Sequence, residues 1–294
     1  MYLNYFGMKE LPFSITPDTG YFFSCSSHQE ALNTLIVAIE SGEGFIKITG
    51  EVGTGKTLLC RKFIKILDEI NATTAYIPNP YVGPMTLLFG VADELGIQYS
   101  ERINQHQILK MLTEFLLARA AAGERVVLCL DEAQALPVET MEALRLLSNL
   151  ETERRKLLQV VLFGQPELND KLANPAIRQL RQRIAFSYNL MPMTREDVSY
   201  YLTHRLMKAG YQGRPLFSQE ASVLMHKLTG GIPRLVNILA HKSLLAVRGE
   251  GMQLVQARHV VSAYDDTDSF TMGKPTRLES LWASAGTWFR KAML

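Results

Sequence analysis

The stretch G-E-V-G-T-G-K-T, at residues 50–57, has the residue types that bind the phosphate groups of a nucleotide. Its glycines let the backbone turn sharply and direct its N–H groups toward one anion. Lys56 can reach the terminal phosphates of ATP, and the Thr57 hydroxyl can ligate Mg²⁺. The pattern G-x-x-x-x-G-K-[ST] therefore predicts a phosphate-binding loop with ATP and Mg²⁺ as cofactors. The residues expected to bind the nucleotide are Gly50, Glu51, Val52, Gly53, Thr54, Gly55, Lys56, Thr57 and Leu58.

Two acidic residues, Asp131 and Glu132, follow the apolar run V-V-L-C-L at 126–130. Asp131 can hold Mg²⁺ through water, and Glu132 can act as a general base on the attacking water. By themselves, two acids after an apolar run are more typical of a solvated strand end. With the glycine loop upstream they predict hydrolysis, because a protein that only binds nucleotide has no need of the second acid.

Both motifs come directly after short apolar runs that have the length of buried strands. Strands are expected at 44–49, 73–77, 126–130, 157–163 and 184–188, and helices at 56–70, 84–95, 105–122 and 137–150. Continuous apolar runs are typical of strands buried on both faces, and strands that alternate with helices form parallel sheets. The expected fold class is therefore α/β, a parallel sheet flanked by helices.

After about residue 190 the strand pattern stops, and helices are expected at 195–209, 218–229, 233–247 and 256–265. Thr194 with Asp197, and Ser218, are residues of the types that cap helix N-termini. Three parts are therefore expected. They are an α/β domain at 1–190 that includes an N-terminal arm, a small all-helical lid at 191–266, and a linker with a C-terminal tail at 267–294.

Composition favours a cytoplasmic protein and gives no support for a nucleic-acid partner. The chain has 294 residues, of which 47% are hydrophobic and 20% charged, and its net charge is only +2. A balanced charge does not indicate a strongly basic surface. Cys25, Cys60 and Cys129 lack metal-ligand spacing and fit reduced thiols. The first 24 residues have no apolar signal core, and no apolar run reaches the ~18 residues that a membrane span requires.

Three later stretches, F-G-Q-P-E-L (163–168), N-P-A-I-R-Q-L-R-Q-R-I (174–184) and T-G-G-I-P-R-L-V-N (229–237), complete a pattern that resembles the P-loop ATPases of the AAA+ superfamily. With the opening Y-F-G-M-K-E-L-P-F-S-I-T-P-D and with S-H-Q-E-A-L (27–32), the chain resembles the general secretion pathway A (ExeA-like) family. Within that family it is most similar to ATPases of mannose-sensitive haemagglutinin (MSHA) type IV pilus systems.

This resemblance implies an ATP hydrolase that forms a ring, such as a homo-hexamer. It also implies that hydrolysis drives conformational change in the assembly of a type IV pilus or secretion system. The expected partners are other copies of the chain and assembly proteins at the inner membrane. Two other functions stay open, a DNA-associated AAA+ regulator resembling the transposition ATPases, and a nucleotide-sensing scaffold that barely hydrolyses.

The resemblance also implies roles for single residues outside the two motifs. Gln165 falls at the sensor-1 position, where it would contact the γ-phosphate or the attacking water, unless it is only a turn residue before Pro166. Asn79 matches a position that can hold the catalytic glutamate inactive, although Asn before Pro80 is also an ordinary turn signal. Arg234 matches sensor 2, which reaches the phosphates from the lid, and its alternative is a solvated residue at a helix start.

Three arginines, Arg178, Arg181 and Arg183, precede the fifth expected strand. They are either a solvated helix face or the source of an arginine finger, which the resemblance implies for a neighbouring subunit's nucleotide. Arginine suits that role because its planar, permanently charged fork matches phosphate oxygens. Arg183 is the first candidate for the finger and Arg181 the second.

The two ends of the chain carry further expectations. Residues 1–30 would form an arm over the adenine, with Phe13, Pro17 and His28 as candidates for lining it or as ordinary packed residues. The tail at 278–294 has apolar residues at helical spacing, including both tryptophans, with basic residues around them. This pattern fits peripheral contact with the inner membrane or with a membrane-bound partner, and a helix folded back onto its own domain is the alternative.

Overall fold

The structure is a computed structural model that describes residues 2–100, 102–147, 150–151 and 156–267. The C-terminal tail, for which a membrane contact is expected, lies outside the described residues. The described chain divides into two compact units. The α/β unit contains residues 16–193 together with 232–234, and the helical unit contains residues 2–15, 194–231 and 235–267. Among the described helices, none is long and apolar enough to cross a membrane.

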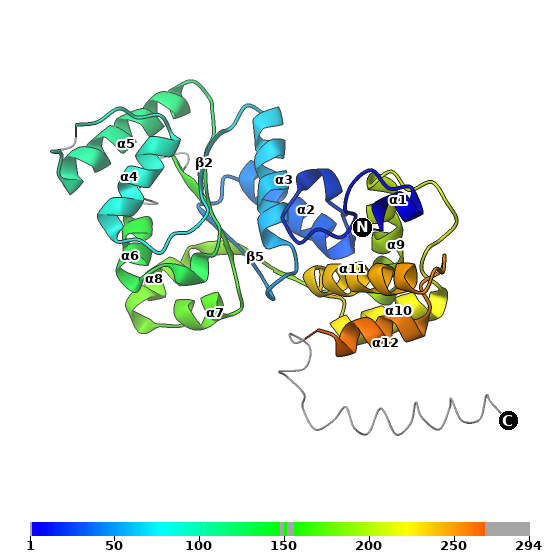
Figure 1. Ribbon diagram of the computed structural model, residues 1–294. Helices are drawn as coiled ribbons and strands as arrows, with labels where there is room; N and C mark the ends of the chain where they lie inside the picture. The colour runs from blue at the N-terminus through cyan, green and yellow to red at the C-terminus, as the bar shows by residue number, and fades with distance from the viewer. Residues whose placement is uncertain (1, 101, 148–149, 152–155, 268–294) are drawn as a thin grey trace. The chain divides into compact units, whose positions relative to one another are not determined.

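A five-stranded parallel sheet forms the centre of the α/β unit, as the sequence predicts (Figure 1). Its strands are β1 (Phe45–Gly50), β2 (Thr73–Ile77), β3 (Val126–Leu130), β4 (Gln159–Gly164) and β5 (Ile184–Leu190). They lie in the order β2-β3-β4-β1-β5, and every pairing is parallel. The carboxyl ends of β1, β4 and β3 therefore meet side by side at one edge of the sheet.

Helices cover both faces of this sheet. They are α2 (Ser26–Glu40), α3 (Lys56–Glu69), α4 (Pro84–Glu94), α5 (Gln105–Ala121), α6 (Val138–Leu147), α7 (Glu167–Leu172) and α8 (Arg178–Gln182), with short 3-10 turns η1 (Thr19–Tyr21), η2 (Ala133–Ala135) and η3 (Pro175–Ile177). Helices α2 and α3 share one hydrophobic cluster with the sheet, and α4 to α8 share the other. The helices α2, α7 and α8 are additions to the helix ranges expected from the sequence.

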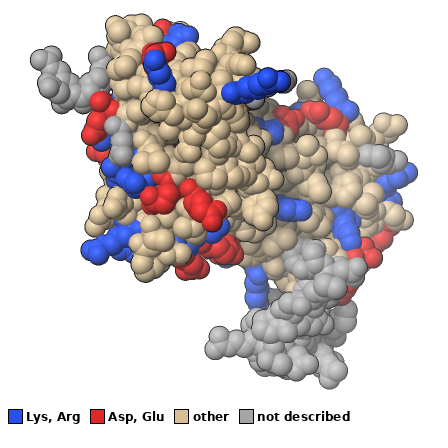
Figure 2. All heavy atoms as spheres, turned by 90° about the vertical axis from the view of Figure 1, so that its left-hand side faces the viewer, with Lys and Arg blue, Asp and Glu red and all other residues tan. Residues whose placement is uncertain are grey.

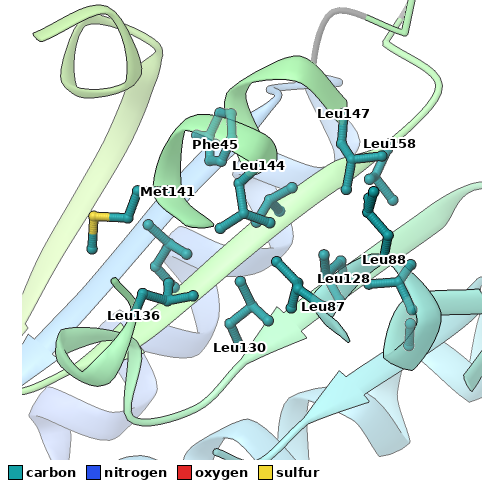
Figure 3. Packing of buried hydrophobic residues seen from close by; sticks show 14 of the residues in the cluster. Phe45, Leu87, Leu88, Leu128, Leu130, Leu136, Met141, Leu144, Leu147 and Leu158 are labelled. Carbon is teal, nitrogen blue, oxygen red and sulfur yellow. The ribbon is translucent and has the colours of Figure 1, made fainter. Parts of the chain in front are cut away.

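The strand β3 shows why its apolar run is continuous. Val126, Leu128 and Leu130 pack in the cluster that includes Leu87, Leu144 and Leu158, part of which Figure 3 shows. Val127 and Cys129 point to the opposite face and pack in the cluster of α2 and α3. All five residues of β3 are buried. Successive side chains of a strand point to opposite faces, so a strand covered on both faces requires apolar residues at every position.

The helical unit contains α9 (Arg195–Lys208), α10 (Gln219–Thr229), α12 (Ala257–Asp265) and the short α1 (Leu3–Phe6). It also contains α11 (Pro233–Gly249) from Leu235 onward. The expected N-caps are confirmed. Thr194 and Asp197 form a reciprocal capping box at the start of α9. The side chain of Ser218 accepts a hydrogen bond from the Ala221 amide at the start of α10. These bonds satisfy amide groups that a helix cannot pair internally.

Residues 2–15 pack with the helical unit, whereas the sequence predicts that the whole arm belongs to the α/β domain. Buried Arg205 explains the difference. Its guanidinium donates hydrogen bonds to the carbonyls of Pro12 and Ser14 and, at 3.2 Å, to the Tyr201 hydroxyl. Asn237 donates a further bond to the Ser14 carbonyl at 3.3 Å. A buried guanidinium requires such acceptors, and the arm's backbone supplies them.

We predict that Arg205→Ala lowers the free energy of unfolding of the helical unit by about 3 kcal/mol, because two arm carbonyls lose a charged donor. The arm itself should become accessible to protease within residues 2–15. Chemical denaturation with limited proteolysis measures both effects. Arg195, exposed on the same helix α9, is the matched control, and its Ala variant should stay within about 0.5 kcal/mol of the wild type. An arm that resists protease in Arg205→Ala would contradict this anchoring role.

Candidate nucleotide-binding site

The predicted phosphate-binding loop connects the end of β1 to the start of α3. Gly53 and Gly55 have φ angles of 86° and 97°, in the left-handed region that favours glycine. A Cβ atom at Gly53 would lie 2.8 Å from the Cβ of Arg234, and one at Gly50 would lie 2.9 Å from the Cβ of Leu190. Gly53 is therefore required both by its backbone conformation and by the close approach of Arg234. Gly55 is required by its conformation, and Gly50 by the close approach of Leu190.

Lys56 lies at the centre of the loop. Its side chain is 5% exposed, and its Nζ donates to the carbonyls of Gly50 at 2.7 Å and of Glu51 at 2.9 Å. Burial lowers the pKa of Lys56, while the nearby Glu132 and Asp131 carboxylates act in the opposite direction. The loop therefore encloses the amine of Lys56 close to two carboxylates. The loop also leads into the N-terminus of α3, where the helix dipole would stabilise a bound phosphate.

The two expected metal ligands contact each other. The Thr57 hydroxyl donates to Oδ2 of Asp131 at 2.7 Å, and the amide of Glu132 donates to Oδ1 of Asp131 at 3.0 Å. Burial raises the pKa of Asp131, and these two hydrogen bonds oppose the rise. A hydroxyl and a carboxylate are the hard oxygen ligands that suit Mg²⁺. The donor set of Thr57 and Asp131 therefore fits this cation.

Glu132 adopts a backbone conformation that is uncommon for a non-glycine residue, with φ of 53°. Its Oε2 atom accepts hydrogen bonds from Nε2 of Gln165 at 3.0 Å and from Nε2 of Gln134 at 2.5 Å. The fold therefore brings together the predicted general base and the predicted sensor-1 residue. The sequence motifs do not indicate a role for Gln134, although it stands two positions after Glu132 in the sequence D-E-A-Q.

Residues 232–234 cluster with the α/β unit and lie against the phosphate-binding loop. The Arg234 amide donates to the carbonyl of Gly53 at 3.2 Å. A Cβ atom at Gly53 would also lie 3.1 Å from the Ile232 side chain. Arg234 is exposed. The backbone contact places this residue beside the loop, and its contact with a phosphate stays a prediction.

Asn79 and Arg183 form hydrogen bonds with residues outside this group of contacts. The exposed Asn79 accepts a hydrogen bond from the Tyr81 amide at 3.3 Å, as a turn residue does. Arg178 and Arg181 are exposed on α8. Arg183 is partly buried, and its Nη1 donates to the carbonyl of Arg145 at 3.2 Å. The roles of Asn79 as a switch and of one arginine as a finger stay predictions.

Of the three residues expected to line the adenine, one lies at the phosphate-binding loop. Nε2 of buried His28 is 3.0 Å from the carbonyl of Thr54, and its Nδ1 is 2.8 Å from the sulfur of Cys25. Phe13 belongs to the helical unit, where its ring packs edge-on against Phe217. The carbonyl of Pro17 accepts a hydrogen bond from Arg61 at 3.3 Å. His28 thus supports the backbone of the loop.

Comparisons with known proteins agree with this architecture. A family model described as an AAA domain matches residues 39–172. The chain is 39% identical over 295 residues to general secretion pathway protein A of Aeromonas hydrophila. That match covers 98% of this chain and 54% of the relative, so the chain spans about half the length of that protein.

Two solved structures share the fold at low sequence identity. Cdc6p of Pyrobaculum aerophilum has a TM-score of 0.67 at 19% identity, covering 90% of this chain and 74% of that one. The RuvB Holliday junction branch migration motor of Thermotoga maritima has a TM-score of 0.53 at 17% identity, covering 90% and 83%. At such identities the likeness shows the fold alone.

The fold and the site together define the class, a P-loop domain of the AAA+ type, which is a class of ATP hydrolases. Within that class the chain is similar to general secretion pathway protein A, the relative with 39% identity. The family resemblance predicted from the sequence is confirmed, and so is the predicted fold class. The narrower similarity to MSHA pilus ATPases stays a prediction.

Substitution of the loop lysine should impair ATP binding, whereas substitution of the general base should impair hydrolysis. Lys56→Ala should lose tight ATP binding, because a charged contact with the phosphates disappears. Glu132→Gln should retain nucleotide binding and lose roughly 10²- to 10⁴-fold in turnover, the usual scale for a general base. Fluorescent-nucleotide titration measures the first effect, and phosphate release measures the second. Equal losses of binding in both variants would contradict the separate roles.

Proposed function

We propose that this chain binds ATP with Mg²⁺ and hydrolyses the ATP. The proposal rests on one observation. Lys56, the Thr57–Asp131 pair and Glu132 lie together at one edge of the sheet. In this arrangement Glu132 accepts a proton from the attacking water, and Lys56 stabilises negative charge on the phosphates. Thr57 and Asp131 would hold Mg²⁺, which when bound offsets the charge that develops on the phosphate oxygens.

The energy of hydrolysis would drive conformational change during assembly of a secretion system or a type IV pilus of the MSHA type. The 39% identity with general secretion pathway protein A supports the secretion role. The pilus assignment rests on the sequence motifs of residues 1–266. The proposed partners are assembly proteins at the inner membrane, with the chain itself in the cytoplasm or held peripherally at that membrane.

We also propose that the working form is a ring in which one subunit supplies an arginine finger to the next. The finger would come from Arg183, Arg181 or Arg178, which follow one another before β5. Arg183 is held by the carbonyl of Arg145 in its own subunit. The planar, permanently charged guanidinium matches the geometry of phosphate oxygens, which supports an arginine in this role.

The solved structures with this fold include proteins in complex with DNA, such as Drosophila ORC bound to DNA. At 16% identity that likeness shows the fold and not a shared ligand. On the face drawn in Figure 2, Lys and Arg side chains are interspersed with Asp and Glu side chains. The net charge of the chain is +2. These charges favour a protein partner over DNA, because nucleic-acid surfaces are usually strongly basic.

The assembly role is tested by capture from membranes. Immobilised Glu132→Gln with ATP should retain assembly proteins from solubilised inner membranes, because it holds the ATP-bound state. Lys56→Ala, which should not bind ATP tightly, is the matched control and should retain little. Mass spectrometry identifies the proteins retained. If labelled duplex DNA binds instead, with an affinity that falls steeply as salt rises, the DNA-associated alternative replaces the assembly role.

The ring is tested by mixing two inactive variants. Arg183→Ala should reduce turnover roughly 10³-fold or more, the scale known for arginine fingers. Mixing it with Lys56→Ala should restore part of the activity, because an intact loop then meets an intact finger at mixed interfaces. Turnover per subunit of the wild type should also rise with protein concentration. If assembly persists and no activity returns, the finger is Arg181 or Arg178.

A further inference from the structure

We propose that Gln134 is a positioning residue that fixes the general base Glu132 and the strand-tip residue Gln165 in one arrangement. The proposal rests on the hydrolytic function proposed above. Gln134 touches both partners through different ends of one amide group. Its role would be exerted through Glu132, without contact with the nucleotide.

The hydrogen bonds among Gln134, Glu132 and Gln165 form a closed cycle. Oε1 of Gln134 accepts from the backbone amide of Gln165 at 2.9 Å, and Nε2 of Gln134 donates to Oε2 of Glu132 at 2.5 Å. Nε2 of Gln165 then donates to the same carboxylate oxygen at 3.0 Å. A backbone N–H can only donate, so the Gln134 atom that faces it must be the carbonyl oxygen. The NH₂ end of Gln134 is therefore directed at Glu132, which as a carboxylate can only accept.

The backbone that carries Gln134 is fixed from two sides. Gln134 is the middle residue of η2, between the fully buried Ala133 and, two residues on, the fully buried Leu136. Nζ of Lys171, in α7, donates hydrogen bonds to the carbonyls of Gln134 and Leu136. The side chain therefore starts from a point that packing and hydrogen bonds both hold, which is what precise placement of a reacting group requires.

The end of β4 is shaped to admit this amide. A Cβ atom at Gly164 would lie 3.2 Å from Oε1 of Gln134 and 2.8 Å from a methyl carbon of Leu168. A larger residue at this position would push against both side chains. Glycine at the last position of β4 therefore lets Gln134 reach the amide of Gln165, the first residue beyond the strand.

Both amide donors bind the same oxygen of Glu132. In the part of the chain that the structure describes, Oε2 receives both hydrogen bonds to this carboxylate. Oε1 is then the oxygen that accepts the proton of the attacking water, and its direction is set by the two bonds on Oε2. A displacement of about 1 Å in a reacting group can cost 10²-fold in rate. Loss of the Gln134 donor should therefore lower kcat more than it changes KM.

The test compares Gln134→Leu, which removes both hydrogen bonds, with Gln134→Glu, which keeps the size and the acceptor but loses the donor. Both variants should lower kcat about 10- to 100-fold and leave KM for ATP and the Kd for nucleotide within about threefold. Exposed Gln98 is the matched control, and Gln98→Leu should keep wild-type kinetics. Thermal unfolding checks that each variant is folded. Should Gln134→Leu fail to fold, Gln134→Glu carries the test.

A double-mutant cycle separates positioning from a general structural effect. In the Glu132→Gln background, Gln134→Leu should reduce the residual turnover less than threefold, because the residue through which it acts is already lost. An undiminished 10- to 100-fold loss in that background would overturn the positioning role. A rise in kcat in the single variant would also overturn it, since Gln134 would then restrain Glu132. Absence of hydrolysis by the wild type would refute the proposed function itself, whereas hydrolysis that Gln134→Leu leaves unchanged refutes only this inference.

Discussion

The parallel register of β3, β4 and β1 sets the distances on which the site depends. Thr49 of β1 pairs with Gly164 of β4, and Leu130 of β3 pairs with Leu162 of β4. Neighbouring strands lie about 4.8 Å apart. The phosphate-binding loop, the acidic pair and Gln165 each begin where one of these strands ends. Three segments distant in sequence therefore deliver their side chains to a single small region.

The two hydrophobic clusters maintain this register. In β3, alternate residues belong to the cluster of α4 to α8 and to the cluster of α2 and α3. A slip of one residue would exchange the two sets of side chains between faces. It would also move Asp131 away from Thr57, to which it is joined at 2.7 Å. The packing of the sheet and the chemistry at its edge are thus parts of one constraint.

The site itself combines buried charge with uncommon backbone conformations. Burial lowers the pKa of Lys56 and raises the pKa of Asp131. Nearby carboxylates oppose this effect at Lys56, and hydrogen bonds from Thr57 and from the Glu132 amide oppose it at Asp131. Glu132 has a positive φ angle, which is uncommon for a residue other than glycine. Such conformations persist where the surrounding structure holds them, and they concentrate at functional sites. At Glu132, the hydrogen bonds with Gln134 and Gln165 hold the carboxylate in place.

The sequence by itself determined the five strands, the helices α3 to α6 and α9 to α12, and the positions of the loop and the acidic pair. Each of these depends on residues close together in the chain, such as an apolar run, a glycine loop or a capping pair. The tertiary structure alone decided that the arm packs on Arg205, that His28 supports Thr54 and that Gln134 joins Gln165. Gln134 and Gln165 are 31 residues apart, and Arg205 and Pro12 are 193 apart. Contacts over such separations arise only when the folded chain brings the segments together, so no local pattern encodes them.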